Sequence, residues 1–145
     1  LILDEPTANF DVEFRKDFLK LLQEFIADGQ KSVVLATHLM EDIDRLADYL
    51  IYLEDGRSIF AGQMEDFREQ YRIVSGEVYK IKLLDREDII AMEQKKYGAK
   101  ALVRHHGYQH YDTELTAVPP TVEEFMYFLS KAKTAERRNY EKVIH

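Results

Sequence analysis

Two adjacent carboxylates near the start of the chain are the residues best suited to chemistry. Asp4 and Glu5 directly follow the apolar run 1–3, which indicates a strand buried on both faces that ends there. At the carboxyl edge of a parallel sheet, one carboxylate could hold a hydrated Mg²⁺ ion while the other polarises a water for in-line attack on a phosphoryl group. The simpler interpretation, which fits most isolated Asp-Glu pairs, is a solvated strand end.

A second strand is predicted to end in polar residues beside the first. The segment 31–37 has the apolar character of a buried strand, and His38 follows it. A lone histidine at a strand end is more often a structural hydrogen-bonding group than a reactant. Its expected place beside Asp4 and Glu5 favours the reactive role, because both strand ends would then carry phosphate-compatible side chains.

Amphipathic helices alternate with these strands. Asp11 is placed to cap a helix that stops at Gly29, and the apolar positions of this helix recur every three or four residues: Phe14, Phe18, Leu21, Leu22 and Phe25. A second helix is expected over about 39–47, a hairpin with an Asp-Gly turn over 49–61, and a third helix over 64–71. This order predicts an α/β layered domain with a mostly parallel sheet and an antiparallel hairpin at its edge.

Three short motifs follow one another in this half. Leu-Ile-Leu-Asp-Glu-Pro-Thr stands at 1–7, Asn-Phe-Asp at 9–11 and Ala-Thr-His at 36–38. In this order they resemble the Walker B motif, the D-loop and the H-loop of the ATPase subunits of ABC transporters. The resemblance extends over about residues 1–72. It implies the C-terminal half of such a subunit, beginning at Walker B within a P-loop NTPase domain.

The resemblance implies a role for each of four residues. Asp4 would hold Mg²⁺ through water, Glu5 would be the general base toward the attacking water, and His38 would contact the γ-phosphate. Asp11 would make a contact across an ATPase dimer. The resemblance also implies that Asp4 and Asp11 are the cofactor-binding residues. ATP and Mg²⁺ are the implied cofactors of the complete subunit. The D-loop departs from the usual family pattern at four positions, whereas Asp11 and Arg15 match it.

The phosphate-binding loop of the family is not found in this sequence. A G-x-x-x-x-G-K-[ST] loop wraps phosphates with backbone N–H groups and reaches them with its lysine. The stretch Gly-Gln-Lys-Ser at 29–32 has an extra residue between glycine and lysine and leads into a strand. A Leu-Ser-Gly-Gly-Gln signature segment is also missing. We therefore expect residues 1–145 alone to be inactive, and to leave a sheet edge and apolar helix faces uncovered.

The pattern changes after Ser75, where the excess of acidic residues ends. Apolar residues at 79, 81 and 83 alternate with lysines and predict a half-buried strand, 85–97 predicts a helix, and two strands are expected around Gly107. Pro119 and Pro120 precede a last helix whose inner face is Val122, Phe125, Met126 and Leu129. These elements predict a small α+β subdomain.

Two domains are therefore expected. Residues 1–75 would be the C-terminal half of an ABC ATPase domain with its Walker B, D-loop and H-loop segments, and 76–145 would be the α+β C-terminal subdomain. Three histidines at 105, 106 and 110 invite a metal-site interpretation. Adjacent residues of a strand point to opposite faces, however, and no carboxylate completes a ligand shell, so we favour a structural role for them.

Composition and charge narrow the function classes further. The chain has 145 residues, a formal net charge of −7 and no cysteine, which excludes disulfides and thiolate metal sites. The acidic balance argues against sequence-independent nucleic-acid binding. No apolar run is long enough to cross a bilayer, so direct membrane insertion is not expected.

The expected function is that of the ATP-binding subunit of an ABC transporter, whose complete form hydrolyses ATP to drive transport through a membrane permease. The expected partners are the permease subunit and a second ATPase subunit, and the expected location is cytoplasmic, at the inner face of the cell membrane through the permease. The alternative is a non-catalytic interaction or regulatory module in which 76–145 binds a partner or ligand. A soluble ABC ATPase of translation or DNA repair fits the segment 36–48 less well.

Overall fold

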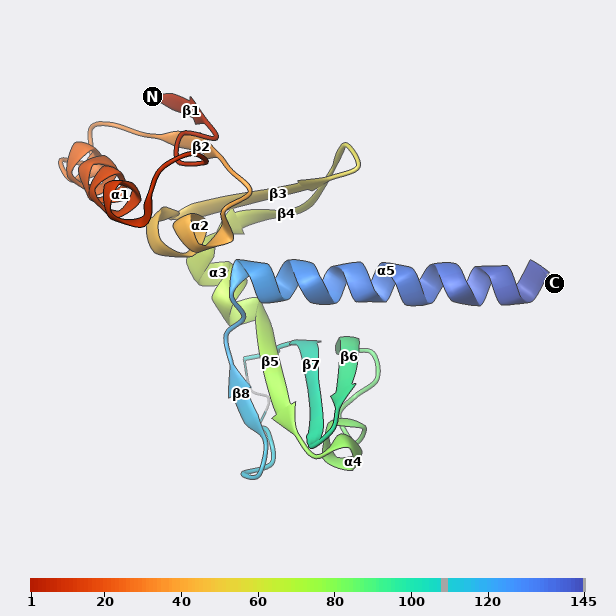
Figure 1. Cartoon of the computed structure of the whole chain (residues 1–145). Coiled ribbons are helices and arrows are strands. Elements are labelled where there is room, and N and C mark those ends of the chain that lie inside the picture. Colours follow the sequence, from red (N-terminus) through yellow and green to blue (C-terminus); the bar gives the residue numbers. More distant parts are fainter. Residues whose placement is uncertain (108–109, 145) are drawn as a thin grey trace. The chain divides into compact units, whose positions relative to one another are not determined.

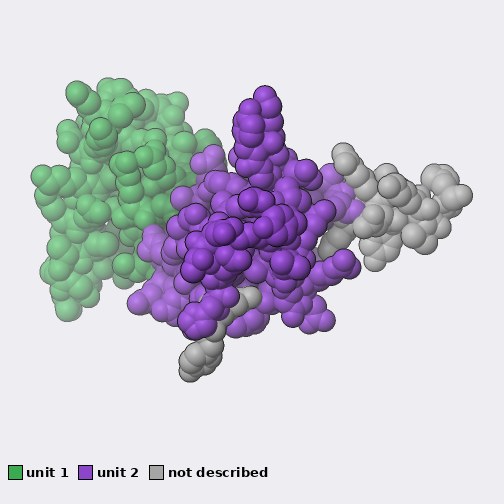
Figure 2. All heavy atoms as spheres, turned by 90° about the horizontal axis from the view of Figure 1, so that it is seen from below, with its two compact units in different colours: residues 1–48 green, residues 49–145 purple. Residues whose placement is uncertain are grey.

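The computed structural model describes residues 1–107 and 110–144 as a mixture of helices and strands (Figure 1). The chain divides into two compact units, residues 1–48 and 49–145 (Figure 2). The domain boundary expected near Ser75 falls inside strand β5 (Tyr71–Gly76), whose sheet pairing continues on both sides of Ser75. The compact units therefore divide earlier along the chain than the change in charge pattern suggests.

The first unit contains two strands, each followed by a helix. β1 (Ile2–Asp4) pairs in parallel with β2 (Val34–Ala36), and the register places Asp4 opposite Ala36. The helices are α1 (Val12–Ile26) and α2 (Met40–Leu46). The predicted order of strand, helix, strand and helix in this half is confirmed.

Helix α1 begins after its predicted cap, Asp11, and ends shortly before the predicted stop at Gly29. The Asp11 carboxylate accepts a hydrogen bond from the Phe14 backbone N–H at 2.8 Å, which satisfies one of the free donors of the first turn. Leu19 and Leu22 are buried on the inner face. The chain leaves the helix after Ile26 and then turns at Gly29, whose φ of +68° favours glycine.

Apolar surface lies exposed on the first unit. Ile2 is 81% exposed and Val34 is 62% exposed, while Phe14 and Leu21 on α1 are more than half exposed. The prediction that both strands are buried on both faces is therefore wrong, because β1 and β2 form a sheet of only two strands within residues 1–107 and 110–144. The expectation of an uncovered sheet edge and uncovered helix faces is confirmed for the same residues.

The second unit opens with the predicted hairpin. β3 (Tyr49–Glu54) and β4 (Arg57–Gln63) pair antiparallel around Asp55 and Gly56, which have φ values of +51° and +74°. Two successive left-handed residues match the turn that an Asp-Gly pair favours. In the part of the chain that the structure describes, the hairpin is a two-stranded sheet of its own and not the edge of a larger one.

A four-stranded antiparallel sheet forms the rest of the second unit. Helix α3 (Met64–Gln70) leads into β5, and the strand order is β6-β7-β5-β8. The other members are β6 (Ile89–Lys95), β7 (Gly98–Arg104) and β8 (Thr116–Val118). A short helix α4 (Val78–Ile81) follows β5, and α5 (Val122–Ile144) contacts β6 and β7 (Figure 1).

Two predictions for this unit are wrong. The segment 79–83, predicted as a strand, holds the helix α4, because Ile81 is buried in the core while Leu83 is 80% exposed and alternate residues share no face. The segment 85–97, predicted as a helix, contains the strand β6, because pairing with β7 overrides its helical pattern. Gly98 does not stop a helix but turns the chain into β7: its φ is +127°, and a Cβ there would lie 2.6 Å from the Gly76 carbonyl oxygen.

The core lies on both faces of the four-stranded sheet. On one face Val74, Ala101 and Val103 pack with Ile81 and Leu115. Ile73 and Leu102, whose side chains alternate with these, are also fully buried. The predicted last helix is confirmed as α5, which buries a row of apolar residues near its start: Val122, Phe125 and Phe128. None of the helices described has the length and apolar character needed to cross a membrane.

Candidate functional site

The predicted catalytic residues meet at the carboxyl edge of the parallel strands. Asp4 is the last residue of β1, and Glu5 follows it with its backbone N–H donating to the Ala36 carbonyl at 2.8 Å. His38 stands two residues after the end of β2. Because neighbouring parallel strands end at the same edge, the two strand ends come together as the sequence predicted.

Glu5 and His38 are in direct contact. The Glu5 Oε1 atom accepts a hydrogen bond from the His38 backbone N–H at 2.9 Å and lies 2.8 Å from the His38 Nδ1 atom. The Thr37 hydroxyl donates to Oε2 at 3.4 Å. His38 is the main reason that the pKa of Glu5 lies below its ordinary value, and partial burial opposes this shift. Glu5 is therefore ionised at neutral pH and able to accept a proton.

The backbone of Glu5 is strained. Its φ is +45°, in the left-handed region that residues other than glycine rarely occupy. Such conformations persist where the surrounding structure holds them, and they are concentrated at functional sites. The left-handed conformation of Glu5 turns the chain sharply after β1, while the Glu5 carboxylate stays in contact with the end of β2.

The contact between Glu5 and His38 should depend on pH. Since the folded pKa of Glu5 lies below its ordinary value of 4.5, the contact stabilises the fold above pH 4.5 and loses this effect as the pH falls through the folded pKa. A carbon NMR titration of the Glu5 carboxyl group should show a midpoint below 4.5. His38→Ala should raise that midpoint clearly, and the control Thr37→Val should raise it less. An identical midpoint in His38→Ala would contradict this assignment.

Asp4 and Asp11 differ in their surroundings. Asp4 is exposed next to Glu5, so its carboxylate can be reached by a hydrated ion. Carboxylate oxygens and water suit Mg²⁺, and the donor chemistry therefore fits the predicted metal. Among the described residues no group of three or more His, Cys, Asp or Glu side chains could hold a metal. Asp11 is the N-cap of α1, a local structural role.

Sequence reasoning missed a buried polar network behind this edge. Asp42 on α2 is 1% exposed and Thr7 is 2% exposed. The Thr7 hydroxyl donates to Asp42 Oδ2 at 2.9 Å, and the Arg15 Nε donates to Asp42 Oδ1 at 2.7 Å. Thr7 and Arg15 were noted only as parts of motifs. The sequence shows that Asp42 follows His38 by four residues. This spacing does not reveal that Asp42 is buried.

Two of the three histidines of the second unit make contacts within that unit. The His105 ring stacks on the Tyr111 ring, with the His105 Nδ1 atom 3.2 Å from the tyrosine hydroxyl. Burial is the main reason that the pKa of His105 lies below its ordinary value. The His106 Nε2 atom lies 3.0 Å from Asp88 Oδ1. His110 is exposed.

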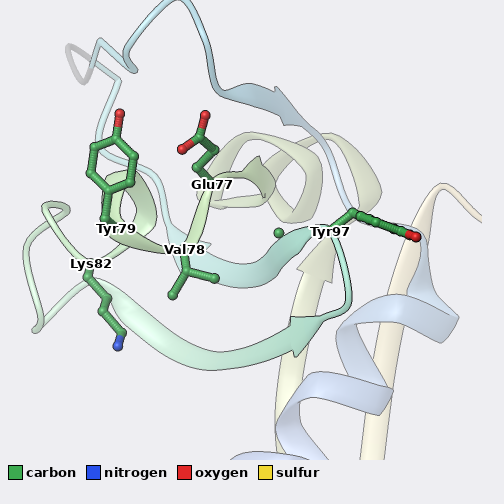
Figure 3. A pocket seen from close by; sticks show the side chains of 6 residues that line it. Glu77, Val78, Tyr79, Lys82 and Tyr97 are labelled. Carbon is green, nitrogen blue, oxygen red and sulfur yellow. The ribbon is translucent and has the colours of Figure 1, made fainter.

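A hollow in the second unit is a weaker candidate for a functional site than the edge with Glu5 and His38. Its volume is about 420 Å³, and it is lined by Glu77, Val78, Tyr79, Lys82, Tyr97 and Gly98. In Figure 3 the Tyr97 side chain extends away from the other labelled side chains, and it is 89% exposed. The lining is therefore loose, and the edge with Glu5 and His38 is the stronger candidate site.

Comparison with known proteins finds similar transporter ATP-binding proteins. No protein-family model matches the chain. Three similar proteins are each named energy-coupling factor transporter ATP-binding protein EcfA2. The one from Streptococcus agalactiae is 29% identical over 126 residues, 87% of this chain and 39% of the relative. The one from Lactococcus lactis is 46% identical over 66 residues, 46% of this chain and 23% of the relative. The one from Spiroplasma kunkelii is 41% identical over 71 residues, 48% of this chain and 23% of the relative.

The chain is similar to part of these transporter ATP-binding proteins, in agreement with the resemblance to ABC transporter ATPase subunits in the sequence. By that resemblance, β1 with Glu5 would be the Walker B segment, and the end of β2 with His38 would be the H-loop segment. The chain spans 23% to 39% of the length of these three relatives. The roles of Asp4, Glu5, Asp11 and His38 in an ABC ATPase stay predictions.

Proposed function

We propose that the complete subunit hydrolyses ATP and that this reaction drives transport through a membrane permease. The observation that carries the proposal is the ionised Glu5 carboxylate, held by His38 at the carboxyl edge of two parallel strands and next to the exposed Asp4. The names of the relatives, energy-coupling factor transporter ATP-binding proteins, support the same function. For this reason we prefer it to a non-catalytic interaction module.

Each residue at this edge has a part in the proposed reaction. Glu5 accepts the proton of the water that attacks the γ-phosphate, and because its pKa lies below the ordinary value its carboxylate is deprotonated at neutral pH before this step. His38 orients the Glu5 carboxylate, and because its own side chain is 68% exposed it is free to reach a phosphate oxygen. Asp4 would hold Mg²⁺ through water, and the ion would supply positive charge to the phosphate oxygens.

The proposed assembly follows from the same assignment. The chain would form the C-terminal part of a P-loop NTPase domain together with a small α+β subdomain. In the assembled transporter it would pair with a second ATPase subunit, to which Asp11 contributes a contact, and both would bind a permease at the inner face of the cell membrane. The apolar surface of α1 and of the β1 and β2 edge supports further packing of this kind.

The Mg²⁺ requirement of ATP hydrolysis tests the proposal. In the full-length subunit, Asp4→Asn should raise the Mg²⁺ concentration for half-maximal hydrolysis by about tenfold or more, since one carboxylate that orders the ion's water shell is lost. The control Asp17→Asn changes an exposed carboxylate on α1 and should leave the requirement unchanged. Failure of the unsubstituted subunit to hydrolyse ATP would refute the proposed function. An unchanged Mg²⁺ requirement in Asp4→Asn would remove Asp4 from its role.

A further inference from the structure

We propose that Asp42 is a positioning residue for the catalytic edge: one buried carboxylate holds the segments that carry Glu5, Asp11 and His38 in a fixed arrangement. The inference rests on the proposed function, because it assigns Asp42 to the geometry of the same site. Asp42 does not lie at the exposed edge itself, so it acts through Thr7 and Arg15. All six residues belong to the first compact unit.

Asp42 is joined to the His38 segment through its own helix. It lies in the first turn of α2, where its backbone N–H donates to the Leu39 carbonyl at 3.0 Å. The chain from His38 to Asp42 is therefore one short, hydrogen-bonded segment. The Thr37 hydroxyl accepts a hydrogen bond from the Leu39 backbone N–H at 3.0 Å, which fixes the same segment to the end of β2. Any shift of Asp42 must move the region that contacts Glu5.

Asp42 is joined to the Glu5 segment through Thr7. The Thr7 hydroxyl is buried and donates to Asp42 Oδ2 at 2.9 Å. Only Pro6 separates Thr7 from Glu5, and its ring restricts the backbone between them. The strained φ of Glu5 needs such an anchor, because a left-handed glutamate relaxes unless the residues around it are held. The anchor at Thr7 thus maintains the direction in which Glu5 leaves the sheet.

Asp42 is joined to the Asp11 segment through Arg15. The Arg15 guanidinium meets Asp42 Oδ1 with its Nε at 2.7 Å and its Nη2 at 2.6 Å. The Arg15 backbone N–H donates to the Asp11 carbonyl at 2.9 Å at the start of α1. A buried carboxylate needs a cation and hydrogen-bond donors to remain charged away from water, and Arg15 and Thr7 provide both.

A network of this kind could also serve stability alone. The two roles differ in what happens when one link is cut. A stabilising network lowers the free energy of unfolding of the whole unit, whereas a positioning network frees the Glu5 turn while α1 keeps its protection. Thr7→Val cuts one link and leaves the Arg15–Asp42 ion pair intact, whereas an Asp42 substitution would take away the partner of Arg15.

The test measures amide hydrogen exchange and ATP hydrolysis in the full-length subunit. In Thr7→Val we expect exchange at the Ala8 and His38 amides, which donate to Glu5 in the intact site, to accelerate about tenfold or more. Exchange along α1 should not change. The kcat for ATP should fall about tenfold or more with an unchanged KM, because misplaced catalytic groups slow the chemical step. Thr7→Ser restores the hydroxyl and should restore both measurements.

The control variant is Arg45→Gln, which removes an exposed ion pair with Glu41 on the same helix and should change neither measurement. Unchanged exchange at Ala8 and His38 in Thr7→Val would overturn the proposal, as would uniform acceleration that includes α1. Accelerated local exchange with an unaltered kcat would also overturn the positioning role. If the unsubstituted subunit hydrolyses no ATP, the proposed function fails, and the exchange data alone then decide whether Asp42 holds the Glu5 turn.

Discussion

Replacing Glu5 with glutamine in the full-length subunit should lower the rate of ATP hydrolysis by about 10²–10⁴-fold, the range expected when a general base is lost. Glutamine has nearly the same shape and keeps an oxygen that can accept the hydrogen bond from the His38 backbone N–H. It cannot accept a proton from the attacking water. The turn after β1 should therefore keep its conformation while the chemical step fails.

Nucleotide binding separates loss of chemistry from loss of structure in this variant. Glu5→Gln should still bind Mg-ATP, and bound ATP should persist because it is not hydrolysed. The matched control is Glu13→Gln, which changes an exposed carboxylate in the first turn of α1 and should keep normal turnover. Undiminished hydrolysis in Glu5→Gln would remove Glu5 from the role of base. Phosphate release and nucleotide retention on the purified subunit are the two measurements.

The second large effect concerns the aromatic core of the second unit. Phe67 on α3 is fully buried, and its ring centroid lies 5.0 Å from that of Phe125 and 5.4 Å from that of Phe60. Phe67→Ala should lower the free energy of unfolding of this unit by about 3–5 kcal/mol, through lost apolar burial and the cavity that remains. The reason for such a large effect is that α3, α5 and the hairpin all contribute rings to this cluster.

Chemical denaturation of the chain measures this effect. Tyr97→Ala serves as the control, because Tyr97 is an aromatic residue of the same unit that is 89% exposed. Its replacement should change the free energy of unfolding by no more than about 0.5 kcal/mol. A loss below about 1 kcal/mol in Phe67→Ala would show that the ring cluster is not the centre of the unit's stability.

The sheet edge that brings Glu5 and His38 together was largely predictable from the sequence. Local rules placed the Asp11 cap, the end of α1 and the Asp-Gly turn, since each depends on residues within one turn of the chain. The contact between Glu5 and His38 joins residues far apart in sequence, but it followed from one assumption. If the two apolar runs are neighbouring parallel strands, the residues after them must meet at one edge.

The buried network at Asp42 was not predictable in the same way. A carboxylate in the first turn of a short amphipathic helix is usually solvated. Whether Asp42 faces water or Arg15 depends on how α2 is rotated against α1, and that rotation is set by packing. The sequence names the residues of the network, whereas their burial is a property of the folded unit.

By itself the sequence determined the motifs, the alternation of strand and helix in the first half, and the position of α5. The tertiary structure alone decided the elements between 78 and 97. There Ile81 enters the core from a helix, and 89–95 becomes a strand because β7 supplies partners for its backbone hydrogen bonds. The physical reason is that caps, turns and helical periodicity act over a few residues, whereas sheet pairing and burial depend on distant segments whose contributions outweigh weak local preferences.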